Sequence, residues 1–267
     1  MGAFSAAGAF SAARGHFQKI RPPAPGSRRA QAPWRMGGVP LNPESSKAEA
    51  AAGQSHGLLA LFCDMEEKWR EEFRAWLAED MFPARLKAGL FACASYDAVA
   101  DIERGTQATV PEFLTLYETA TVADLYGEAY QSLRRDRDER DTAIHERMMG
   151  LERYTLASAG PSPAPGGELA PVVYVDRFDL RPDDIGAFNA WFVNEYLSWC
   201  AKLRGLVRVR RYLSMEGAPR HFILHEFEDR SFYEDAVWKA LRNSKEWVMA
   251  GNTYGAPGLY ERAVKAP

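Results

Sequence analysis

The sequence has little of several features that would place it in a well-defined class. It contains only three cysteines, Cys63, Cys93 and Cys200, which lie far apart. An odd, scattered set argues against a disulfide framework and a cysteine zinc site, and predicts a reducing, cytoplasmic location. No apolar run approaches the ~20 residues of a membrane-spanning helix. A net charge of -3 gives no electrostatic reason to expect a nucleic-acid partner.

Common catalytic and cofactor motifs are also missing. The chain has no G-x-G-x-x-G, G-x-x-x-x-G-K-[ST], H-E-x-x-H or C-x-x-C segment. "HERMM" at His145 and "HEFED" at His225 each lack a second histidine at ligand spacing. A dedicated zinc site is therefore not predicted.

The N-terminal stretch has no acidic residue before Glu44, although it carries several arginines and is rich in Ala, Gly, Ser and Pro. Such a composition does not bury enough apolar surface to fold alone, so residues 1–54 are predicted to be a disordered tail. A basic, serine-containing stretch poor in acids is also typical of a transit peptide. Organelle targeting is therefore the alternative, and whether residues 1–35 persist in the mature protein stays open.

The rest of the chain contains an internal repeat. Residues 159–169, rich in Pro, Gly and Ser, read as a linker between a first half, 55–158, and a second half, 170–267. "FRAW" matches "FNAW", "PEFLTLYE" matches "PRHFILHE", and "LYGEAYQSLR" matches "YEDAVWKALR". Short runs bounded by Gly or Pro and apolar residues at helical spacing give each half the order β-α-β-β-α-β, the ferredoxin-like unit.

A four-stranded sheet of this kind has helices on one face and nothing on the other. Two such sheets in one chain can cover each other. The predicted fold is therefore α+β, with two tandem ferredoxin-like units whose sheets face each other and form a barrel within one chain, as a monomer or a dimer.

Four segments carry a family resemblance: "AWLAEDMFPARL", "GLFACASY", "GLVRVRRY" and "FLTLYE". With them the chain resembles the dimeric α+β barrel superfamily, and within it the EthD-like and stress-responsive barrel proteins. Such proteins often read W-Y-x-x-E-H-L-P-x-R-L. Their histidine falls on Met81 and Tyr196 here, while the preceding acid remains as Asp80 and Glu195. The resemblance implies the barrel fold. It also implies a range of activities: cofactor-free monooxygenases, polyketide cyclases, isomerases, dehydratases and haem enzymes.

Strand alternation divides the side chains between two faces. We expect the helices to cover Leu58, Ala60, Phe91, Cys93, Leu114 and Leu116 of the first half, and Val173, Val175, Val207, Val209, Phe222 and Leu224 of the second. The opposite face would then line a cavity inside the barrel. Its expected lining is Leu59, Leu61, Ala92, Ala94, Phe113, Thr115 and Tyr117, with Tyr174, Asp176, Arg208, Arg210, His221, Ile223 and His225.

An apolar cavity with a few converging polar groups is typical of a small-molecule site. The predicted catalytic residues are His225 or Asp176 as general base and Tyr196 or Tyr117 as donor to an oxyanion. The predicted substrate-binding residues are Arg208, Arg210, His221, Tyr117, Tyr174, Phe113 and Ala92.

Each of these residues also has a structural explanation. His225 could be a core histidine, Asp176 could simply pair with Arg208, the two arginines could lie on an exposed edge strand, and the tyrosines could be core aromatics.

The leading functional hypothesis is an enzyme without a cofactor that carries out isomerase, cyclase or lyase proton transfer on a partly aromatic, anionic small molecule. A cofactor-free monooxygenase is a variant of it. The alternatives are a non-catalytic ligand-binding or stress-associated barrel protein, and a haem protein with His145 as candidate ligand.

Overall fold

The computed structural model describes residues 56–99, 110–160, 168–244, 252–253 and 257–266. The predicted tail and most of the predicted linker lie outside these residues. All described residues belong to one compact unit, Asn42–Pro267. In this part of the chain, no helix is long and apolar enough to cross a membrane.

The first half has the predicted order of elements. Its strands are β1 (Gly57–Asp64), β2 (Ala92–Ala98), β3 (Phe113–Thr119) and β4 (Met149–Ser158). Its helices are η1 (Glu67–Trp69), α2 (Arg70–Trp76), η2 (Leu77–Met81), α3 (Phe82–Lys87), η3 (Val122–Tyr126), α4 (Glu128–Arg135) and α5 (Glu139–Arg147).

The second half repeats this order with one short strand added. Its strands are β5 (Val172–Asp179), β6 (Leu206–Ser214), β7 (His221–Phe227), β8 (Asn252–Thr253) and β9 (Gly258–Lys265). Its helices are η4 (Pro182–Asp184), α6 (Ile185–Trp191), η5 (Phe192–Tyr196), α7 (Leu197–Cys200), η6 (Arg230–Glu234) and α8 (Ala236–Arg242). The segments η2 and η5 are single π-helical turns at matching places of the repeat.

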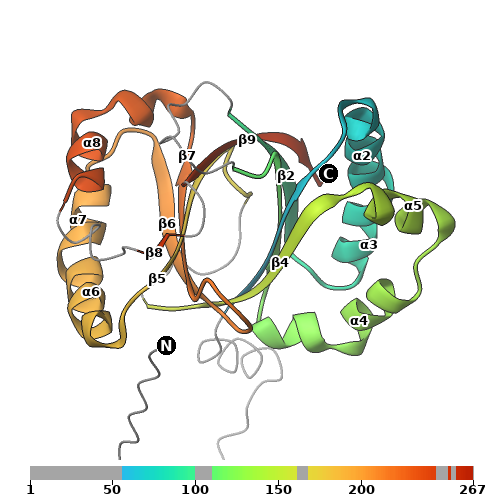
Figure 1. The fold of residues 1–267 in the computed structure, drawn as a ribbon, viewed down its shortest axis with the longest axis horizontal. Coiled ribbons are helices and arrows are strands. Elements are labelled where there is room, and N and C mark those ends of the chain that lie inside the picture. The colour runs from blue at the N-terminus through green and yellow to red at the C-terminus, as the bar shows by residue number, and fades with distance from the viewer. Residues whose placement is uncertain (1–55, 100–109, 161–167, 245–251, 254–256, 267) are drawn as a thin grey trace, which may run out of the picture. The chain divides into compact units, whose positions relative to one another are not determined.

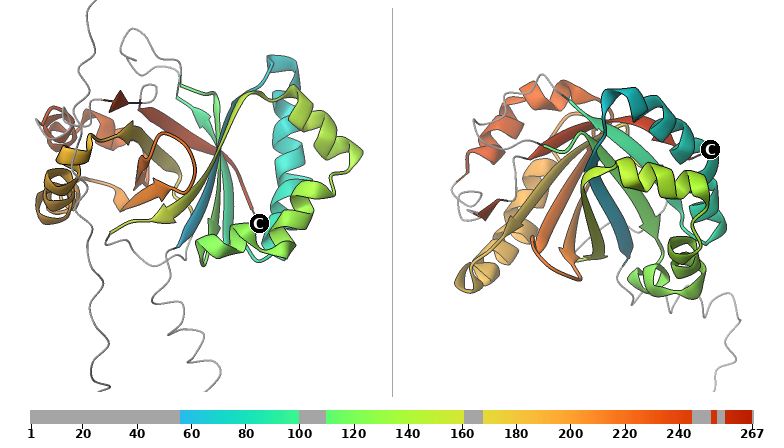
Figure 2. Two further views of the ribbon diagram at one scale, coloured as in Figure 1. Left: turned by 60° about the horizontal axis from the view of Figure 1, so that its bottom comes forward. Right: turned by 45° about the vertical axis from the view of Figure 1, so that its right-hand side comes forward.

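The strands form one closed antiparallel barrel (Figures 1 and 2). Their order is β7-β6-β4-β1-β3-β2-β9-β5, β7 pairs with β5 to close the ring, and β8 extends β5 at its end. Each half keeps the ferredoxin-like order, and the joins between halves are β4–β6 and β2–β9. Helices α2 to α5 cover one side of the barrel and α6 to α8 the other. The predicted α+β barrel within a single chain is confirmed.

The barrel interior is filled by side chains from both halves. Leu58, Leu116, Val173 and Leu224 belong to this mixed core, together with Tyr212. Two further cores lie between the sheet and the helices, one in each half. The aliphatic residues of the central strands thus meet inside the barrel.

The predicted faces of four strands were therefore wrong. On β1, β3, β5 and β7 the residues expected under the helices line the barrel interior, and those expected inside it lie under the helices. Cys93 and Val209 on β2 and β6 do face the helices, and Ala94 faces the interior. All residues of β3 and β7 are buried. Because both faces of these strands are covered, hydrophobicity could not tell one face from the other.

Candidate functional site

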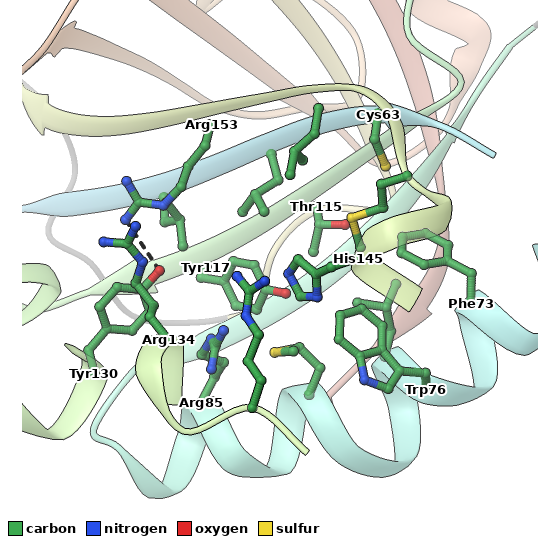
Figure 3. Close-up of a pocket in the computed structure, with 17 residues that line it drawn as sticks. Cys63, Phe73, Trp76, Arg85, Thr115, Tyr117, Tyr130, Arg134, His145 and Arg153 are labelled. Carbon is green, nitrogen blue, oxygen red and sulfur yellow. Dashed lines mark hydrogen bonds between the residues drawn. The ribbon is translucent and has the colours of Figure 1, made fainter. Parts of the chain in front are cut away.

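A cavity of about 190 Å³ lies between the sheet and the helices of the first half (Figure 3). It lies outside the barrel, which corrects the predicted position. Strands β1, β3 and β4 form its floor and α2, η2, α3, α4 and α5 its walls. The apolar lining includes Leu59, Leu61, Phe73, Trp76, Leu77, Met81 and Met148, and the polar lining includes Arg85, Thr115, Tyr117, Tyr130, Arg134, Arg137, His145 and Arg153.

The cavity has a cationic end and an aromatic end. Figure 3 shows Arg85, Arg134 and Arg153 grouped near Tyr130, with Trp76 at the other side. The Arg153 guanidinium donates to the Tyr130 hydroxyl over 3.3 Å. A ligand that combines a negative charge with an apolar body would match this polarity.

Arg85 is the most unusual of the cavity cations. It belongs to α3 and is only 8% exposed. Its guanidinium lies 5.8 Å and 5.2 Å from the ring centres of Tyr117 and Tyr130. Its Nε atom is buried without a hydrogen-bond partner, and no carboxylate of the described chain lies within ion-pair distance. A buried charge without a counter-ion is costly, so this arginine calls for an explanation outside the fold.

His145 of α5 also lines the cavity, between the cationic end and Trp76 (Figure 3). Its Nδ1 lies 2.9 Å from the Asp141 carbonyl oxygen and 2.7 Å from Asp141 Oδ1. Because a carbonyl oxygen only accepts, the proton of the neutral imidazole is on Nδ1. Burial lowers the pKa of His145, with the Asp141 contacts opposing the shift. At neutral pH, Nε2 therefore carries a free lone pair.

Three of the predicted catalytic residues come together in the second half, under α6, α7 and α8. The Tyr196 hydroxyl lies 2.7 Å from His225 Nε2, and Asp176 Oδ2 lies 3.7 Å from His225 Nδ1. Arg242 donates two hydrogen bonds to the Asp176 carboxylate, at 2.9 and 2.6 Å. The predicted pairing of Asp176 with Arg208 is wrong. The ring of Tyr174 packs edge-on against His225 at 6.0 Å.

This second-half cluster is closed. His225 is 0% exposed, and burial lowers its pKa to about 3. Burial likewise raises the pKa of Tyr196 well above its usual range. A histidine with so low a pKa is a weak base at neutral pH. Catalytic roles for His225, Asp176 and Tyr196 stay predictions.

The two predicted substrate arginines of β6 lie inside the barrel. Arg208 Nε donates to Glu226 at 2.9 Å, while Arg210 contacts both Glu226, at 2.6 Å, and Glu118. Two guanidinium groups thus face two buried carboxylates in a cluster that joins both halves. Neither arginine lies on an exposed edge, since β6 pairs with both β4 and β7.

The remaining predicted binding residues are dispersed. His221 stacks on Phe178 at 5.3 Å, and burial lowers its pKa to about 4. Phe113 packs edge-on against Phe73 at 5.1 Å. Ala92 lines a second cavity, of about 280 Å³, beside β9. Of the predicted binding residues, Tyr117 alone lines the cavity of the first half.

The size of the first-half cavity can be set against the haem hypothesis. His145 has a free Nε2 of the kind that ligates haem iron. Sites for drug-sized ligands measure about 300–1,000 Å³, however, and about 190 Å³ is below that range. A haem does not fit the cavity in this structure, and no step is assigned to one.

The sequence contained a signal for Arg85 that its interpretation missed. Arg85 belongs to "FPARL", the segment that carried the family resemblance, and lies four residues after Met81. On a helix this spacing places both side chains on one face. Arg134, Arg137 and Arg153 are far apart in sequence from Arg85, and no local pattern joined them to it.

These observations define a class, a single-chain α+β barrel with an open cationic cavity in the first half and a closed polar cluster in the second. No protein-family model and no curated protein matches the sequence. Among solved structures, the fold is similar to a mutant chlorite dismutase from Candidatus Nitrospira defluvii in complex with cyanide. The TM-score is 0.55 at 11% identity, over 82% of this chain and 95% of that chain.

It is also similar to a proposed monooxygenase from Fusobacterium nucleatum, with a TM-score of 0.52 at 9% identity, over 80% of this chain and 95% of that chain. At such identities the similarity establishes the fold alone. The chain therefore has the α+β barrel fold of these proteins, and its chemistry has to be argued from its own residues.

Proposed function

We propose that this protein is a small-molecule enzyme that binds a partly aromatic anion in the first-half cavity and transfers a proton with His145. The observation that carries this proposal is Arg85. Its guanidinium is buried and lines the cavity, and no described carboxylate neutralises it. A bound anion would supply the missing counter-charge.

The proton-transfer role rests on the hydrogen bonds of His145. Its Nδ1–H is held by the Asp141 carbonyl, which fixes the tautomer and the ring orientation. Nε2 is then positioned as a general base toward a ligand in the cavity. The lowered pKa of His145 keeps the imidazole neutral at pH 7, which is the state that accepts a proton.

The cationic end would hold the negative charge of the substrate and of the transition state. The rings of Tyr117 and Tyr130 lie beside the Arg85 guanidinium, and both side chains line the cavity. Hydroxyl donors such as theirs can stabilise an oxyanion that forms as the proton leaves. Isomerisation, cyclisation and elimination all begin with such a proton abstraction. A cofactor-free oxygenation of an activated phenol shares this first step and is a variant of the proposal.

The small volume limits the substrate. About 190 Å³ is less than a drug-sized site, so a single-ring compound is the size that the cavity supports. The finer resemblance to EthD-like and stress-responsive barrels agrees with a small aromatic substrate and remains part of this proposal.

The test begins with native mass spectrometry and an absorbance spectrum of protein purified from its own host. We expect a co-purified single-ring acid and no Soret band. The compound is then assayed with wild-type protein, His145→Gln and the control Glu146→Gln, which changes the exposed residue that follows His145 in α5.

His145→Gln should lower kcat by at least 100-fold with little change in binding, whereas Glu146→Gln should keep wild-type turnover. Full turnover in His145→Gln would refute the proton-transfer role. Binding without turnover in the wild type would instead favour the alternative, a non-catalytic ligand-binding barrel.

A further inference from the structure

The two halves place different side chains at equivalent points above the sheet. Leu61 of β1 pairs across the ladder with Thr115, and Asp176 of β5 pairs with Ile223. Thr115 and Ile223 hold the same place in "FLTLYE" and "HFILHE". Leu61 is therefore the first-half counterpart of Asp176.

The helices above these positions carry equivalent arginines in their last turns. Arg134 and Arg242 hold the same place in "YQSLR" of α4 and "WKALR" of α8. Arg242 donates both of its terminal nitrogens to the Asp176 carboxylate. Arg134 is exposed and lines the cavity, and its guanidinium donates to the neutral Gln131 side chain over 3.3 Å.

The second half thus contains its own carboxylate at a point where the first half has an uncharged leucine and a cavity. We propose that the ligand of the first-half cavity is a small aromatic carboxylate. The carboxylate of this ligand takes the place that the Asp176 carboxylate holds in the second half. The Arg134 side chain turns into the cavity and pairs with it, as Arg242 pairs with Asp176. This inference rests on the proposed function and specifies its substrate class.

The rest of the cavity agrees with this orientation. Arg85 lies at the same cationic end as Arg134 (Figure 3), so two guanidinium groups are available to one carboxylate. Trp76 lies at the opposite end (Figure 3), Met81 also lines the cavity, and both side chains suit the flat apolar body of one ring. His145 lies between the two ends and would face the atoms next to the carboxylate.

The first experiment is calorimetric titration with benzoate, salicylate and phenylacetate, and with benzamide as the uncharged analogue. We expect Arg134→Gln to weaken the carboxylates at least tenfold and to leave benzamide unchanged. Arg135→Gln is the matched control, because Arg135 is the next residue of α4, pairs with Glu128 and does not line the cavity. It should bind as wild type does.

The second experiment supplies the carboxylate from the chain. Leu61→Asp should bind the carboxylates at least tenfold more weakly than wild type. It should also have a higher melting temperature than Leu61→Asn, because the new aspartate would pair with Arg134 as Asp176 pairs with Arg242. Adding Arg134→Gln to Leu61→Asp should remove that advantage.

Three outcomes would overturn the inference: no carboxylate binds the wild type, Arg134→Gln binds as wild type does, or Leu61→Asp melts below Leu61→Asn. Arg85→Gln separates these failures from failure of the proposed function. If Arg85→Gln loses an anionic ligand that Arg134→Gln retains, the cavity proposal stands and only the assigned carboxylate position fails. If both variants bind as wild type does, the cavity proposal fails as well.

Discussion

Acid should destabilise the protein through one buried histidine, His225. Its pKa is lowered by burial to about 3, whereas an unfolded histidine titrates near 6.5. Protonation therefore favours the unfolded chain. The stability that neutral His225 provides is complete above pH 6.5 and is lost as the pH falls from there toward 3.

The magnitude follows from the pKa difference. At about pH 4.5 the unfolded histidine is nearly fully protonated and the folded one is still neutral. Each pH unit below 6.5 then removes about 1.4 kcal/mol, so the loss reaches about 2.7 kcal/mol. Since His225 is 0% exposed, solvent screening does not reduce this figure much.

The assay is urea unfolding of wild type and His225→Gln at a series of pH values from 7 to 4.5. At pH 7 the free energy of unfolding of the variant should already be lower than that of wild type, because Tyr196 loses its partner at 2.7 Å. The test is the slope of the free energy of unfolding against pH. Over this range wild type should lose about 2.7 kcal/mol more than the variant. His221, whose pKa burial lowers to about 4, contributes equally to both proteins. Parallel slopes would refute the reasoning.

Three further predictions concern the buried interior. Glu226→Gln should lower the free energy of unfolding by about 3–5 kcal/mol in urea titrations, because Glu118 would be the one carboxylate left for Arg208 and Arg210. A loss below about 1 kcal/mol would contradict this. Leu116→Ala should lower the free energy of unfolding by about 2–5 kcal/mol in the same assay, since Leu116 is 1% exposed inside the barrel. A loss of only a few tenths of a kcal/mol, as for a surface residue, would contradict that placement. The three cysteines should not react with a thiol reagent at pH 8 until the protein unfolds, because burial raises the pKa of each to about 12; rapid labelling of native protein would show otherwise.

The barrel could be predicted from the sequence because the same pattern of elements occurs in both halves of the chain. "FRAW" and "FNAW", and the paired "LYGEAYQSLR" and "YEDAVWKALR", fixed the order of elements twice, and the need to cover two sheet faces then led to one closed barrel. Such reasoning depends on periodicity and order, which are local properties of the chain.

The candidate site was less accessible, for two physical reasons. On β3 and β7 both faces are buried, so alternation could not show whether Tyr117 and His225 face the helices or the barrel interior. The partner of Asp176 is Arg242, 66 residues away, and sequence spacing does not reveal such a pairing.

The measurement that tests the central claim most directly is the free energy of unfolding of Arg85→Met in ligand-free buffer, beside Arg210→Met. Both arginines are buried, but Arg210 has two carboxylate partners, whereas Arg85 has none among the described residues. If Arg85 is retained for a ligand, Arg85→Met should lose no more than about 1 kcal/mol, the size of its contacts with the two tyrosine rings, and can gain stability. Arg210→Met should lose about 3–5 kcal/mol, because it leaves the buried Glu118 carboxylate without its cation and Glu226 with Arg208 alone. An equal large loss in both variants would show that Arg85 serves the fold, and would contradict the anion site.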